Sequence, residues 1–154
     1  MSRGKKAYLQ FTEPLNAALA RLATLREELK SAIDADAESY NVVMKAYKAA
    51  KESTDGARLI NSALQQATSV PLGVAEKSAE VARIVSALIP VTNPNMSSDL
   101  TTATALARAA LTGALANVEI NLGSLKPATP DDAAFQARVR ERVNAIGIAT
   151  PDRS

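Results

Sequence analysis

Apolar residues recur at alternating steps of three and four between Leu15 and Tyr47, which is the pattern of an amphipathic helix with one apolar face. The positions in this stripe are Leu15, Leu19, Leu22, Leu25, Leu29, Ile33, Asp36, Tyr40, Val43 and Tyr47. Asp36 is the one carboxylate among them. Burying an unpaired carboxylate is strongly unfavourable, so we expect a carboxylate on this core face to be paired or to have a chemical role.

The same pattern predicts the first two helices and the turn between them. The first helix is expected from near Thr12 to about Ala50, and the polar segment 51–56 indicates a turn. A second apolar stripe runs from Leu59 to Ile89 and is interrupted by Pro71. Proline removes one backbone donor, so this stretch predicts either a kinked helix or two abutting helices that end at Pro90.

A third helix is predicted from Ser97 to about Asn121, with residues 97–99 as its cap. One of its faces is narrow and is made of Ala103, Leu106, Ala110, Gly113, Asn117 and Asn121. We expect another backbone to approach this face closely. A loop over 122–132 and a short helix from Ala133 to Ile146 complete an all-α, up-and-down bundle of long, partly kinked helices in a single domain, 1–154.

Composition supports this fold and narrows the chemistry. The 154 residues suit one domain, and only 3% of them are aromatic, which favours helices over sheets. The net charge of +2 is too small to indicate nucleic-acid binding, and the local basic group at Lys5 and Lys6 predicts a solvated end or a small anion site.

The absence of cysteine and histidine excludes disulfides, thiolate chemistry, the usual zinc sites and Ser-His-Asp triads. Acid–base chemistry must therefore use Asp, Glu, Lys or Tyr. No apolar run approaches the roughly 20 residues that cross a bilayer, and the first residues lack a hydrophobic signal core. We therefore expect a cytoplasmic protein with no membrane partner.

Five segments, in order, resemble the formiminotetrahydrofolate cyclodeaminase and methenyltetrahydrofolate cyclohydrolase family. They read GKKAY at 4–8, DADAESYNVVM at 34–44, ATSVPL at 67–72, NPNMSSD at 93–99 and NVEINL at 117–122. The resemblance spans about residues 4–126, and the C-terminal helix and tail, 127–154, follow it. It implies a tetrahydrofolate derivative as substrate, no bound metal or redox cofactor, and a homodimer with sites near the subunit contacts.

The resemblance also points to the Asp-Ala-Asp segment as catalytic, and Asp36 is its inward member. As a base, Asp36 would accept the proton from the folate N10 or activate water, and its charge would stabilise an amidinium-like cation. The alternative is a carboxylate buried in the core, whose charge neighbouring groups pair or hydrogen-bond.

Asp99 is either the partner acid or an ordinary first-turn helix acid. Tyr40 either contacts Asp36 or the pterin, or packs in the core. Asn117 and Asn121 either bind the pterin or bridge helices.

The remaining candidates would contact the ends of the substrate. Lys48, Lys5 and Lys6 would meet the glutamate tail, although lysines at such positions are usually solvated. Asn95 would either present its amide to the pterin or make the turn.

Two features depart from the family pattern. The family normally opens with an additional helix led by a Pro-Thr-Pro-Gly-Gly-Gly-Ser-like stretch, suited to holding an anionic or carbonyl group, and this sequence starts after it. Residues 48–51 also read Lys-Ala-Ala-Lys where the family commonly has Lys-Leu-Pro-Lys. The first departure keeps a second hypothesis open: a non-catalytic dimeric helical-bundle scaffold that lost its folate site.

Overall fold

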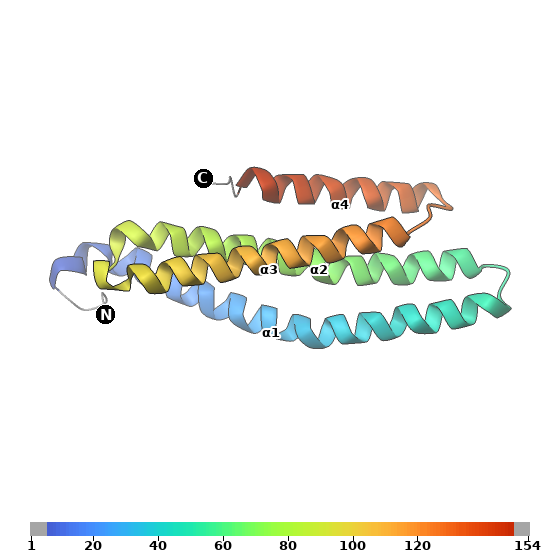
Figure 1. The fold of residues 1–154 in the computed structure, drawn as a ribbon, viewed down its shortest axis with the longest axis horizontal. Coiled ribbons are helices and arrows are strands. Elements are labelled where there is room, and N and C mark those ends of the chain that lie inside the picture. The colour runs from blue at the N-terminus through green and yellow to red at the C-terminus, as the bar shows by residue number, and fades with distance from the viewer. Residues whose placement is uncertain (1–5, 150–154) are drawn as a thin grey trace.

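The computed structural model describes residues 6–149, which form an all-α bundle. Its four long helices are α1 (Thr12–Ala49), α2 (Gly56–Leu88), α3 (Ser97–Ser124) and α4 (Pro130–Ala149). They run alternately in opposite directions along one axis, with α1 and α4 on opposite sides of the α2–α3 pair (Figure 1). Short 3-10 turns flank or connect them: η1 (Lys6–Phe11), η2 (Ala50–Glu52), η3 (Ile89–Val91) and η4 (Pro94–Met96). The predicted up-and-down helical bundle is confirmed.

Helix α2 is the central element, because α1, α3 and α4 all pack against it. Many of its buried side chains are small, which lets neighbouring helices approach closely; they include Ala63, Ala67, Ala75, Ala79 and Ala82. The main hydrophobic cluster lies where α2, α3 and α4 meet, around Leu72, Val118 and Val139. Helix α1 contributes no residue to that cluster. None of the helices in the described part of the chain has the length and apolar character of a membrane span.

The boundaries of the first two helices follow the sequence closely. Helix α1 begins at Thr12 as expected, and α2 runs unbroken through Pro71, so the alternative of two abutting helices is wrong. Two other expectations are also wrong. No side chain caps the start of α3, and α4 begins at Pro130 rather than Ala133.

The long apolar stripe of α1 faces the core over only part of its length. Leu15 and Leu25 are buried, but Ile33 is 70% exposed and Tyr40 is 63% exposed. In this second half the buried residue is Ser39, which lies one position away from Tyr40. Leu19, in the first half of the stripe, is also 52% exposed. The expectation that the whole stripe packs in the core is wrong.

The middle of the narrow face of α3, from Leu106 to Asn117, is likewise exposed rather than packed, whereas Asn121 at its end contacts α2. The helix packs through a neighbouring face, made of Leu100, Ala107, Leu111, Ala114, Val118 and Leu122. Apart from the glycine itself, its chain neighbours and the adjoining backbone of α3, no atom lies within 4 Å of the point where a Gly113 side chain would begin. Larger apolar residues on the adjacent face bury more surface against α2, and this difference explains why the narrow face stays open.

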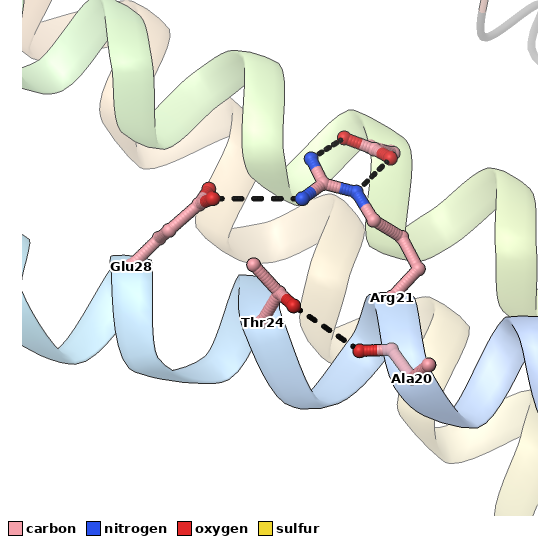
Figure 2. A network of polar contacts seen from close by, with 5 residues as sticks. Ala20, Arg21, Thr24 and Glu28 are labelled. Atoms are coloured by element: carbon pink, nitrogen blue, oxygen red, sulfur yellow. Dashed lines mark hydrogen bonds and ion pairs between the residues drawn. The ribbon is translucent and has the colours of Figure 1, made fainter.

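Two bidentate ion pairs link α2 to α1 and to α4. Arg21 of α1 donates to both carboxylate oxygens of Glu80, at 2.6 and 2.7 Å, and lies 3.5 Å from Glu28 (Figure 2). This hydrogen bonding holds the pKa of Glu80 below its ordinary value, against the opposing effect of burial. One turn earlier on α2, Glu76 accepts from Arg142 of α4 at 2.7 and 2.8 Å. Because both pairs are partly exposed, they orient the helices more than they stabilise them.

A buried carboxylate fixes the start of α4. Asp132, 5% exposed, accepts hydrogen bonds from the backbone N–H groups of Ala128 and Thr129 and from the side chains of Asn61 and Gln65. The Thr129 hydroxyl accepts in return from the Asp132 N–H, which makes a reciprocal capping box. Two of these five hydrogen bonds, from Asn61 and Gln65, tie the first turn of α4 to α2, and the other three are local to residues 128–132.

We expect the contribution of Asp132 to stability to depend on pH. Its pKa is lowered, chiefly by the hydrogen bond from the Ala128 N–H, so its stabilising effect is complete above the ordinary aspartate pKa of about 3.9 and is lost as the pH falls through the lower folded-state value. Urea unfolding should show that Asp132→Asn lowers the midpoint at pH 7, and that its difference from the wild type shrinks below about pH 4.

The exposed neighbour Asp131 provides the matched control. Asp131→Asn should leave the fall of the urea midpoint at acid pH the same as in the wild type. An equal loss for Asp132→Asn at pH 7 and pH 3 would contradict this role for the carboxylate charge.

Candidate functional site

An open groove of about 290 Å³ lies between α1, α2 and α3. Its lining residues are Leu29, Ala32, Ile33, Asp36, Pro71, Val74, Ala110, Gly113, Ala114 and Asn117. Of these, Asp36 is the only ionisable residue, and Asn117 is the only other one with a polar side chain. The groove therefore combines an apolar surface with one carboxylate and one amide, which is the usual make-up of a small-molecule site.

Asp36 lies on the wall of this groove rather than in the core. Its side chain is exposed, so the expectation of a buried carboxylate is wrong. Helix α3 packs on α2 and leaves the adjacent face of α1 uncovered, and this arrangement explains the exposure. The local backbone is held by Ser39, whose buried hydroxyl donates to the Asp36 carbonyl oxygen at 2.8 Å. The carboxylate is thus accessible to a ligand, on a helix that packs here through Ser39.

The two asparagines of α3 have different surroundings. Asn117 is exposed and lines the groove with Asp36. Asn121, one turn later, is half-buried, and its amide nitrogen donates to the Ala67 carbonyl of α2 at 3.0 Å. Two roles were considered for these amides, and the Asn121 nitrogen has one of them: it links α3 to α2.

The other residues on α1 are more distant or point outward. Tyr40 follows Asp36 by about one helical turn and is exposed, so the alternative that it packs in the core is wrong. Lys48 is also exposed, and it lies twelve residues beyond Asp36, about 18 Å along the helix axis. One chain alone does not bring Lys48 to the groove.

Three predicted residues belong to the first turn of α3 or to the short turns that precede α1 and α3, and these two helices begin at the same end of the bundle (Figure 1). Asp99 is exposed in the first turn of α3, about 17 Å along the axis from the nearest groove residue of that helix, Ala110. Asn95 is exposed, and its backbone N–H donates to the Asn93 side chain, which forms the expected turn. Lys6 is exposed in η1, and Lys5 lies outside the described residues.

Several groove residues were not among the predicted site residues. Pro71 and Val74 form the part of the groove contributed by α2, and Gly113 contributes an open surface on α3. In the sequence, the signal that could have drawn attention to this part of α2 was Pro71, because a proline interrupts an otherwise continuous helical pattern. Within residues 6–149, no three Asp or Glu side chains cluster in a way that would hold a metal ion.

Comparison with known proteins identifies the family. A family model described as Formiminotransferase-cyclodeaminase matches residues 1–145, beyond the 4–126 on which the sequence resemblance rested. The chain belongs to this family. The match ends at residue 145, within α4, so it covers the first three helices completely and most of the fourth.

Named relatives in the formiminotransferase-cyclodeaminase family differ in length from this chain. It is 34% identical over 137 residues to formimidoyltransferase-cyclodeaminase of Sus scrofa, matching 86% of this chain and 23% of that protein. It is 34% identical over 143 residues to methenyltetrahydrofolate cyclohydrolase of Methylorubrum extorquens, matching 90% of this chain and 66% of that protein.

A solved structure shares the fold. The crystal structure of formiminotetrahydrofolate cyclodeaminase from Thermotoga maritima superimposes with a TM-score of 0.84 at 27% identity, and the match covers 96% of this chain and 69% of that one. The bundle is therefore the fold of a formiminotetrahydrofolate cyclodeaminase.

The position of Asp36 predicts that the fold does not depend on its charge. Asp36→Asn should change the free energy of unfolding by less than about 0.5 kcal/mol, as expected for an exposed helix position. Urea denaturation measures this difference. Leu25→Ala serves as the reference for a large loss, because it empties a fully buried position and should destabilise the fold by about 2–5 kcal/mol. A loss for Asp36→Asn as large as that of Leu25→Ala would identify a structural carboxylate instead.

Proposed function

We propose that this protein acts on a tetrahydrofolate one-carbon derivative, as a formiminotetrahydrofolate cyclodeaminase or a methenyltetrahydrofolate cyclohydrolase. The observation that carries the proposal is the Asp36 carboxylate, the only ionisable group lining an otherwise largely apolar groove. The family relationship supplies the substrate class, since named relatives include both activities.

Asp36 suits the proton transfers that either reaction needs. In the cyclodeaminase reaction, the folate N10 attacks the formimino carbon on N5, loses a proton, and ammonia leaves from that carbon after protonation. In the cyclohydrolase reaction, water attacks the cationic methenyl carbon and loses a proton. A carboxylate beside that carbon accepts the proton in each case, and its negative charge favours the cation that both reactions share.

Asn117 lies across the groove from α1 and offers the complementary chemistry. Its side-chain amide can both donate and accept hydrogen bonds, which suits the amide-like edge of a pterin ring. The small residues Ala110 and Gly113 leave space for a flat ring beside it. We therefore assign ring binding to Asn117 and proton transfer to Asp36.

The groove of one chain is small for a whole folate. Its volume of about 290 Å³ lies at the lower limit of small-molecule sites, and it is open to solvent. Among the described residues, the groove lining does not include the other candidates, namely Lys6, Tyr40, Lys48, Asn95, Asp99 and Asn121, and Lys5 lies outside the described residues. We propose that these residues complete the site from outside this groove, and that some of them come from a second copy of the chain.

A homodimer is supported by exposed apolar residues on both sides of the groove. On α1, Ile33, Tyr40 and Tyr47 recur every seven residues and are exposed. On α3, Leu106 and Ile120 lie seven residues on either side of Gly113 and are 67% and 65% exposed. Large exposed apolar patches mark interaction surfaces, and a self-complementary contact would cover both rows of exposed apolar residues at once.

The absence of a bound metal or redox cofactor and the cytoplasmic location stay predictions of the sequence.

The activity assay follows the near-ultraviolet absorbance of methenyltetrahydrofolate, with spontaneous hydrolysis subtracted. Asp36→Asn should lower kcat by about a hundredfold or more, because the amide cannot accept the proton. Glu27→Gln, which removes an exposed carboxylate of the same helix outside the Asp-Ala-Asp segment, should retain activity. Ammonia release from the formimino substrate then distinguishes the two reactions. A wild-type chain without either activity would support the scaffold hypothesis.

The dimer has its own test in sedimentation equilibrium. Tyr40→Glu should convert a wild-type dimer into monomer, because it places a charge within the apolar line on α1. Ile89→Glu is the control, since Ile89 is 52% exposed but lies in η3, just beyond the end of α2 and outside the groove. A wild-type chain that sediments as a monomer at all concentrations would refute the homodimer.

A further inference from the structure

Pro71 deprives one carbonyl of α2 of its helical hydrogen bond. In a regular α-helix the carbonyl oxygen of residue 67 accepts from the N–H of residue 71. Proline has no backbone N–H, yet α2 continues unbroken from Gly56 to Leu88. Ala67 and Pro71 are both buried, so water does not readily replace the missing donor.

Asn121 of α3 supplies a donor to that carbonyl. Its amide nitrogen lies 3.0 Å from the Ala67 oxygen, and the hydrogen bond joins two helices across 54 positions of sequence. Asn121 is half-buried, and the amide therefore compensates a specific defect in the neighbouring helix.

The bond acts next to the candidate site. Pro71 lines the groove, and Asn117, which lies one turn before Asn121 on α3, also lines it. The hydrogen bond thus connects the turn of α2 that contains Pro71 to the groove-facing part of α3. Asp36 is on the opposite wall, so the spacing between the walls depends on where these two turns meet.

We propose that Asn121 is a positioning residue, whose amide replaces the donor that Pro71 lacks and thereby holds the α2 and α3 walls of the groove in register opposite Asp36. The structural part concerns the chain alone, and the catalytic consequence rests on the proposed function. A direct substrate contact through the same nitrogen would require the bond to Ala67 to break.

A double-mutant cycle tests the proposal on the full chain, with Asn121→Ala, Pro71→Ala and the double variant. Asn121→Ala should lower the folding equilibrium constant by about tenfold, because it leaves the Ala67 carbonyl unpaired. In the Pro71→Ala background, the N–H of the new alanine can pair with that carbonyl. Removing Asn121 there should have an effect several-fold smaller, and the same rescue should appear in kcat/KM for methenyltetrahydrofolate.

Other outcomes overturn the proposal. Equal effects of Asn121→Ala in both backgrounds would mean that Asn121 does not compensate Pro71. If Asn121→Ala does not fold, the double variant must fold, and its failure to do so refutes the coupling. Asn121→Asp gives an independent test: it preserves the shape but cannot donate when ionised, so wild-type stability in this variant would also refute it. Asn16→Ala, at an exposed asparagine of α1, is the matched control.

The two proposals fail in different ways. If the wild-type chain turns over no folate substrate, the proposed function fails, and the unfolding cycle still decides whether Asn121 compensates Pro71. If the wild type is active and the cycle shows no coupling in stability or in kcat/KM, the positioning role fails and the proposed function stands.

Discussion

The close packing of α2 against its neighbours is the constraint on which the rest of the structure depends. Its buried alanines lose no side-chain entropy on folding and keep the helices near one another. The same closeness reaches the start of the helix, where a side-chain carbon at Gly56 would lie 2.6 Å from the Ala50 carbonyl oxygen. Glycine at this position allows the chain to turn from α1 into α2 without separating them.

A central helix that contacts all the others leaves some of their faces uncovered. Helices α1 and α3 both pack on α2, and the groove with Asp36 and Asn117 lies between them. Bulky residues such as Ile33 and Leu106 are exposed beside it for the same reason. The geometry that opens a possible site for chemistry therefore also creates the apolar surface for which we propose a second copy.

Polar groups inside the bundle are paired across helices. Asp132 collects donors from two segments, and Asn121 donates to the carbonyl that Pro71 leaves without a helical partner. Within residues 6–149, no buried side-chain nitrogen or oxygen lacks a hydrogen-bond partner. Because an unpaired buried group is costly, each of these contacts restricts how the helices can slide past one another. The groove is bounded by helices that are fixed in this way.

Local patterns were sufficient to locate the helices. The turn around Gly56, the proline-rich connection before α3 and the steps of three and four placed α1 and α2 within about two residues of their observed ends. The start of α4 was missed by three residues, although Thr129 and Asp132 have the local spacing of a capping box and Pro130 stands at the first helical position. Segments along the chain also carried the family resemblance and drew attention to Asp36.

The sequence by itself thus determined the all-α class, the order of the helices, the family and the candidate carboxylate. Only the tertiary structure decided that Asp36 lies on an open groove, that Asn117 lines it, and that Asn121 pairs with Ala67. Periodicity reports which side chains share a face of one helix. It does not report which neighbour covers that face, because small contact residues such as Ser39 carry little hydrophobic pattern and their partners are distant in the chain.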